Sequence, residues 1–107
     1  MPEILEIPLS KEDNSFKIRV ILEGIQLVLR LDWVERDLRW TISIFDAQET
    51  ALVVGLPMNI NTELIARFEI DGLPPGKLFL YDSSGGWAEA GRDDLGDRAK
   101  LLYQNSV

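Results

Sequence analysis

The chain has 107 residues, of which 46% are hydrophobic and 27% charged, and this is the composition of an ordinary globular protein. Because it contains no Cys and no His, disulfides, thiolate nucleophiles, His-based general bases and the usual zinc sites are excluded. The 11 Lys and Arg residues are scattered among 18 Asp and Glu residues, and the net charge is −7. Nucleic acid and anionic membranes are therefore poor candidates for partners.

The first residues of the chain lack the basic and then apolar pattern of a signal peptide. No apolar run approaches the ~20 residues that would span a bilayer. We therefore expect a protein that is made in the cytoplasm and does not enter a membrane.

Strict alternation of apolar and polar residues predicts three consecutive strands in the first half of the chain. These runs and their joints are Ser15–Leu22, Glu23-Gly24, Ile25–Trp33, the segment 34–37, and Leu38–Phe45. Alternating strands with short joints predict an antiparallel meander. A leading strand is expected within Glu3–Leu9.

Glycine and proline interrupt the next part of the chain more often. After a turn at 46–50, a short strand is expected over Ala51–Val54, ended by Gly55 and Pro57. The segment Asn61–Phe68 fits either a short helix capped near its first residue or an irregular connection.

The C-terminal part is expected to contain two strands, Lys77–Tyr81 and Arg98–Tyr103, on either side of a long surface loop at 82–97. The whole chain, 1–107, then forms one all-β domain. It is either a small antiparallel β-sandwich or a barrel built on the meander, because both bury the same alternating faces. Leu29, Ile42 and Leu78 are expected in its core.

Carboxylates are the remaining candidates for chemistry. Asp93-Asp94 lies near Glu89 and Asp97 and would suit a Ca²⁺ site or a general acid–base pair. The alternating ligands and final Glu of a calcium loop are missing, so a solvated acidic turn is the better interpretation. Gly85-Gly86 is not followed by the Lys-Ser/Thr of a phosphate loop. We expect no catalytic residue, no metal, no cofactor and no enzyme activity.

The three tryptophans fall into two groups. Trp33 and Trp40 continue the apolar faces of adjacent strands, which predicts a cross-strand pair in the core, with a role at an interface as the alternative. Trp87 lies in the loop 83–91, whose small residues give little reason for order within its own domain. It would either cover the core or dock into a partner, and a sugar-binding module is a further alternative.

Three apolar residues, Ile21, Val28 and Phe45, interrupt the polar faces of their strands. They predict that the outer face of the meander is partly apolar. Either a second layer of the same domain or a neighbouring subunit would cover it, since sandwiches and interfaces leave the same pattern in a sequence.

Several motifs occur together in one order along nearly the whole chain. They are an early Ile7-Pro8-Leu9, Leu31-Asp32-Trp33, Leu38-Arg39-Trp40-Thr41-Ile42-Ser43-Ile44-Phe45-Asp46, Gly55-Leu56-Pro57-Met58, Thr62-Glu63-Leu64-Ile65, Leu73-Pro74-Pro75-Gly76-Lys77-Leu78, Asp94-Leu95-Gly96-Asp97-Arg98 and Leu102-Tyr103. In this order and spacing the chain resembles the small baseplate plug proteins of contractile-tailed bacteriophages, best exemplified by a cyanophage baseplate.

This resemblance implies a structural virion component, made in the host cytoplasm and built into the tail baseplate in a symmetric, multi-copy assembly. It implies hub, spike and wedge proteins as partners, and no catalytic residue or cofactor. Partner contacts are then expected in the irregular C-terminal part, at Trp87, Asp94, Leu95 and Arg98. A tail assembly factor and a carbohydrate-binding β module are the alternative functions.

Overall fold

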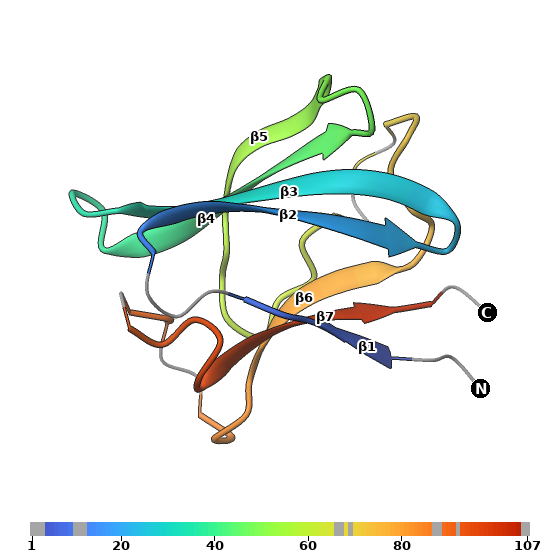
Figure 1. Ribbon diagram of the computed structural model, residues 1–107. Helices are drawn as coiled ribbons and strands as arrows, with labels where there is room; N and C mark the ends of the chain where they lie inside the picture. Colours follow the sequence, from blue (N-terminus) through green and yellow to red (C-terminus); the bar gives the residue numbers. More distant parts are fainter. Residues whose placement is uncertain are drawn as a thin grey trace.

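The computed structural model describes residues 4–9, 13–65, 68, 70–86, 89–91 and 93–105. Within these residues seven strands form two antiparallel sheets (Figure 1). The strands are β1 (Ile4–Ile7), β2 (Ser15–Leu22), β3 (Ile25–Val34), β4 (Arg39–Asp46), β5 (Ala51–Pro57), β6 (Lys77–Asp82) and β7 (Ala99–Gln104). The all-β fold class predicted from the sequence is confirmed.

The four-stranded sheet has the order β2-β3-β4-β5 and contains the predicted meander. Its first hairpin turns at Glu23 and Gly24, whose φ angles of 50° and 80° are both positive. Positive φ at both central residues is the geometry of a type I′ turn, which matches the natural twist of the flanking strands. The turn sets Leu22 opposite Ile25, so that the apolar faces of β2 and β3 coincide.

The predicted end of the fourth strand of this sheet at Val54 was wrong, because β5 continues through Gly55 and ends at Pro57. Gly55 has a φ of 68°, and its N–H donates to the Ser43 hydroxyl at 3.0 Å. The register between β4 and β5 shifts on either side of Ile44. A glycine with positive φ inside a strand is typical of a β-bulge, which bends the strand without ending it.

The three-stranded sheet has the order β1-β7-β6, so the predicted leading and closing strands lie side by side. The alternative of a helix over Asn61–Phe68 was wrong for the described part of that segment. Ile60 and Glu63 instead form single bridges with β6. The Glu63 carboxylate accepts the N–H groups of Ile65 and Leu78, both at 3.0 Å, and this holds residues 63–65 beside the sheet.

The two sheets lie face to face as layers of a sandwich, and they are not closed into a barrel (Figure 1). Inward-facing residues of both sheets join in one hydrophobic cluster, which includes the predicted core residues Leu29, Ile42 and Leu78. The predicted pair of Trp33 and Trp40 is confirmed, with ring centroids 5.7 Å apart. Burying each large apolar side chain stabilises the fold by roughly 1.5–3 kcal/mol.

Tyr103 on β7 joins the two layers from within the core. Its hydroxyl donates to the Glu23 carboxylate at 2.6 Å and accepts the Gly76 N–H at 2.8 Å. A Cβ at Gly76 would collide with the Gln104 carbonyl and the Tyr103 hydroxyl, so only glycine fits immediately before β6. Burial and the neighbouring Glu23 raise the pKa of Tyr103 from 10.0 to about 12.

Candidate functional site

Of the four residues predicted to contact a partner, Trp87 lies outside the described residues. The other three lie in the connection between β6 and β7. The Leu95 side chain is 1% exposed and belongs to the hydrophobic cluster, so it packs inside the fold and is not offered to the surface. Asp94 and Arg98 are partly exposed and contact each other.

Arg98 is the centre of a hydrogen-bonded ion cluster. Its Nη1 lies 2.8 Å from Asp82 Oδ2, and its Nη2 lies 2.7 Å from Asp94 Oδ2 and 3.0 Å from the Glu89 carbonyl oxygen. Asp82 is 1% exposed, and a carboxylate buried to this degree needs charged or hydrogen-bonding partners. Ser84 supplies two more, through its N–H at 2.9 Å and its hydroxyl at 2.6 Å.

These contacts keep all three ionisable groups charged near neutral pH. Hydrogen bonds from Ser84, with a further contribution from Arg98, lower the pKa of Asp82. The Arg98 hydrogen bond and the Gly91 N–H lower the pKa of Asp94, and the hydrogen bonds to Asp94 and Asp82 raise the pKa of Arg98. A general acid or base works best with a pKa near the working pH. The cluster is therefore suited to holding the connection in place and poorly suited to proton transfer.

Contacts from distant residues hold the same connection. The Asn61 side chain donates to the Gly86 carbonyl and accepts the Asp82 N–H, both at 3.0 Å. Trp40 Nε1 donates to the Gly91 carbonyl at 3.0 Å. The expectation that the loop 83–91 has little reason for order within its own domain is thus wrong for its described residues. Its partners are up to 51 positions away in the sequence, where no local pattern reveals them.

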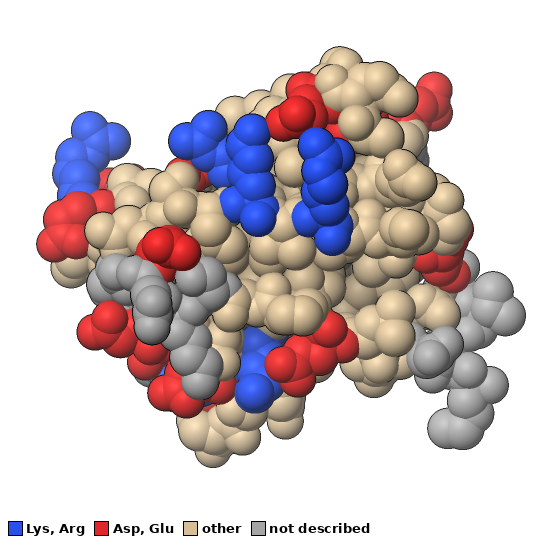
Figure 2. Space-filling view, in the orientation of Figure 1, with Lys and Arg blue, Asp and Glu red and all other residues tan. Residues whose placement is uncertain are grey.

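The outward face of the four-stranded sheet carries a cluster of cations that sequence reasoning missed. It consists of Lys17 and Arg19 on β2 and Arg30 on β3, and it is called the basic face below. The register places Lys17 directly opposite Arg30. The three side chains are 56%, 70% and 48% exposed. Figure 2 shows Lys and Arg side chains side by side over this sheet, in contrast to the net charge of −7.

Carboxylates partly neutralise the basic face. Glu49, in the turn between β4 and β5, lies 3.0 Å from Lys17 Nζ and 3.7 Å from Arg19 Nη2, and Asp32 lies 3.2 Å from Arg30 Nε. The Lys17 hydrogen bond lowers the pKa of Glu49. Exposed ion pairs of this kind contribute little to stability, because solvent screens them. They restrain the side chains, but they do not explain why cations are grouped here.

A hollow of about 260 Å³ adjoins the basic face. It is lined by Arg19, Val20, Ile21, Gln26, Leu27 and Ala47. The outer face of the meander was predicted to be partly apolar at three positions, and these differ in how far solvent reaches them. Val28 is 2% exposed, while Ile21 is 63% exposed. Phe45 is half-buried. The open apolar surface is therefore at Ile21, beside Arg19.

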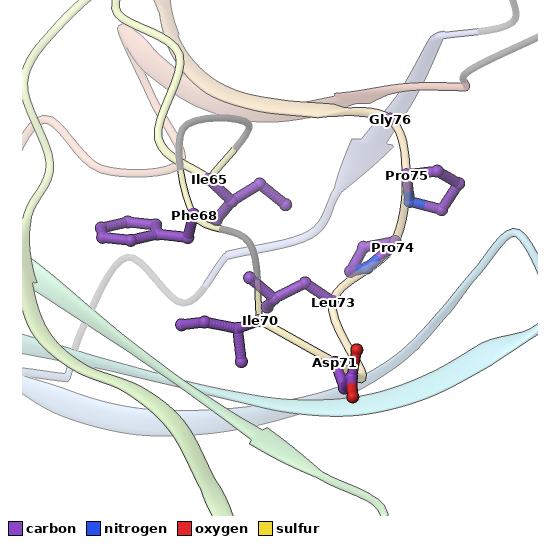
Figure 3. A pocket seen from close by; sticks show the side chains of 8 residues that line it. All are labelled: Ile65, Phe68, Ile70, Asp71, Leu73, Pro74, Pro75 and Gly76. Carbon is purple, nitrogen blue, oxygen red and sulfur yellow. The ribbon is translucent and has the colours of Figure 1, made fainter.

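A second hollow, of about 340 Å³, lies in the connection that leads into β6 (Figure 3). Ile65, Phe68, Ile70 and Leu73 present apolar side chains around it, with Pro74 and Pro75 on the opposite side. Among the described residues that line it, Asp71 is the one ionisable residue. Such a concavity can receive an apolar side chain, and its described lining residues bring together no set of groups for catalysis.

The signal for the basic face was present in the sequence. Lys17 and Arg19 are two residues apart, so they share a face of one strand. The two-residue turn at Glu23-Gly24 then sets the register that places Arg30 beside them. The alternation identified Lys17, Arg19 and Arg30 only as polar residues, and their shared positive charge was not considered.

No group of three or more Asp and Glu side chains that could hold a metal ion occurs among the described residues. Within the same part of the chain, no helix is long and apolar enough to cross a membrane.

Comparison with known proteins gave one family. The family model described as cyanophage baseplate Pam3 plug gp18 matches residues 4–106 of the chain. No curated protein matches it. The matched range includes all strands of both sheets and the connections between them.

Proposed function

The chain belongs to the family of the cyanophage baseplate plug and is a structural baseplate protein, and we propose that it is a plug-like subunit that binds neighbouring hub, spike or wedge proteins. It is made in the host cytoplasm and enters the virion in several symmetry-related copies. The family match over residues 4–106 is the observation that carries this proposal.

The surface of the sandwich supports a role among close neighbours. β2 and β5 are the edge strands of one sheet and β1 is an edge strand of the other, so their outer backbone groups are open to pairing. The free edge of β6 is partly covered by the bridges from Ile60 and Glu63. Large apolar side chains are exposed at Ile21 and Val54. A subunit enclosed by others can keep such surfaces, because its neighbours cover them.

The proposal is tested by asking whether the chain remains in the finished tail. Tails are purified from cells that make the phage with an epitope-tagged chain, and the chain is quantified by mass spectrometry against a major tail protein. We expect a fixed number of copies per tail and a baseplate defect in electron micrographs of a strain that lacks the gene. A chain that is present during assembly but absent from mature tails would be an assembly factor, and the proposal would be wrong.

A further inference from the structure

We propose that the basic face, together with Ile21 and the hollow beside it, binds a carboxylate-bearing segment of another baseplate protein, with an apolar side chain of that segment in the hollow. This inference rests on the proposed function and names the surface and the chemistry of one partner.

The first argument is the placement of the cations. Lys17 and Arg30 are directly opposite each other on neighbouring strands, and like charges in that position destabilise a sheet. Nothing in the core requires charge there, because all three side chains point outward and are about half exposed or more. Local arrangements that oppose folding are typical of functional sites, and the ion pairs to Glu49 and Asp32 offset this one only in part. The ligand that offsets such a cluster is an anion.

The second argument concerns which anion fits. Each cation already lies within 3.7 Å of Glu49 or Asp32, so the basic face is only mildly positive. Binding a nucleic acid needs many uncompensated cations, and a chain of net charge −7 repels a polyanion. A second copy of the chain is disfavoured for the same reason. Carboxylates of another protein fit better, because Arg guanidinium groups bind them through paired hydrogen bonds.

The third argument is the apolar surface beside the cations. Ile21 is 63% exposed, and the hollow of about 260 Å³ is lined partly by Val20, Leu27 and Ala47. Protein interfaces combine an apolar contact that excludes water with charged groups at its rim. The hollow and the basic face share Arg19, so one short segment can occupy both. A ligand with an apolar side chain flanked by Asp or Glu matches this arrangement.

Two pairs of variants compare this surface with the outward face of the other sheet. Arg19→Gln with Arg30→Gln removes two cations from the basic face, and Lys77→Gln with Lys100→Gln removes two from β6 and β7. Ile21→Thr removes apolar surface while keeping a β-branched residue, and Ile4→Thr is its control, since Ile4 is 56% exposed on β1. All four full-length variants are made in place of the wild-type chain, and the amount retained in purified tails is measured.

We expect each variant of the proposed surface to be retained roughly tenfold less than wild type, and each control to be retained like wild type. Melting temperatures of the purified variants should stay within about 4 °C of wild type, so that loss of folding does not explain the result. At about 1 M salt the Debye length is about 3 Å, so ion pairs at the interface are screened. Washing tails at this salt concentration should therefore release a larger fraction of the bound wild-type chain than of the bound variant with Arg19→Gln and Arg30→Gln. Absence of the wild-type chain from tails would overturn the proposed function itself. Equal retention of surface and control variants would overturn only this inference.

A zero-length carbodiimide cross-link tests the chemistry of the partner directly. The reagent joins an amine to a carboxylate, so Lys17 in assembled tails should be joined to an Asp or Glu of another baseplate protein. The pair of Lys17 and Glu49, 3.0 Å apart, is the internal positive control. Products confined to Glu49, or formed with a second copy of this chain, would overturn the inference.

Discussion

The Tyr103 hydroxyl serves two groups from different elements, because it accepts the Gly76 N–H and donates to the Glu23 carboxylate. Tyr103→Phe keeps the buried ring but removes both hydrogen bonds. We expect it to lower the free energy of unfolding by about 1–3 kcal/mol, measured by denaturant titration. The control is Tyr81→Phe, on a 44% exposed side chain, which should cost under about 0.5 kcal/mol. Equal costs at the two tyrosines would contradict a structural role for the Tyr103 hydroxyl.

Two glycines are required for different physical reasons, and alanine substitutions should separate them. At Gly55 an added Cβ meets no atom within 4 Å, but the φ of 68° is unfavourable for alanine, so Gly55→Ala should cost about 1–2 kcal/mol. At Gly76 the Cβ collides with backbone and with Tyr103, and Gly76→Ala should cost about 3 kcal/mol.

A double-mutant cycle tests whether the collision of a Cβ at Gly76 with Tyr103 destabilises the fold. Tyr103→Phe removes one of the atoms with which the new Cβ collides. Gly76→Ala combined with Tyr103→Phe should therefore lose less stability than the sum of the single variants. Additive costs would show that the clash with the Gln104 carbonyl alone explains the effect.

At the level of the strand, the alternation in β3 makes neighbouring residues unequal. Leu29 faces the core and Arg30 faces outward. Leu29→Ala should cost roughly 2–5 kcal/mol, because it removes buried methyl groups and leaves a cavity. Arg30→Ala should cost under about 1 kcal/mol. Denaturant midpoints of the two variants provide the measurement, and similar values would mean that both faces of β3 are covered in the isolated protein.

The strands that the sequence predicted well are those whose signal is local. In β2, β3 and β4 the period-2 pattern and the short turns coincide, and the structure keeps the predicted faces except at Leu38. Leu38 was predicted on the inward face, but it lies in the turn before β4 with a φ of 51° and is 66% exposed. The errors occur where a distant contact overrides a local signal. β5 continues through Gly55 because the Ser43 hydroxyl on β4 accepts its N–H, and Glu63 is held beside β6 by a bridge and a hydrogen bond.

The candidate site also has some features that a local sequence pattern predicts and others that depend on distant contacts. Burial of Leu95 and the ion cluster at Arg98 depend on contacts with Asp82 and with the core, which no spacing in the sequence reveals. The basic face could have been predicted, since it follows from β-strand period and one turn. Membership of the family was recognisable because the order of motifs is a property of the chain and needs no contact map.

At the scale of the whole molecule, the shifted ionisable groups lie at the two ends of the pH range. The pKa values of Asp82 and Asp94 are lowered in the folded state from 3.8, and that of Tyr103 is raised from 10.0 to about 12. The carboxylates therefore contribute stability that is present above about pH 4 and is lost as the pH falls through their folded-state pKa. Tyr103 contributes stability that is present below pH 10.0 and is lost as the pH rises through about 12.

These signs predict a stability plateau around neutral pH with a fall on either side. The chain has no His and no Cys, so only the terminal amine has an ordinary pKa between about 6 and 8. Denaturant titration measures the free energy of unfolding at each pH. Between about pH 6 and 8 we expect it to change by less than about 1.4 kcal/mol, which is the equivalent of one pKa unit. Ser84→Ala removes a hydroxyl that lowers the pKa of Asp82, so it should reduce the loss of stability at acid pH. Tyr103→Phe should reduce the loss of stability at alkaline pH. If Tyr103→Phe loses as much unfolding free energy at alkaline pH as wild type does, the Tyr103 hydroxyl is not the cause of that loss. A larger change within the neutral window would require a carboxyl group with a strongly raised pKa, and the case for a functional acid would have to be made again.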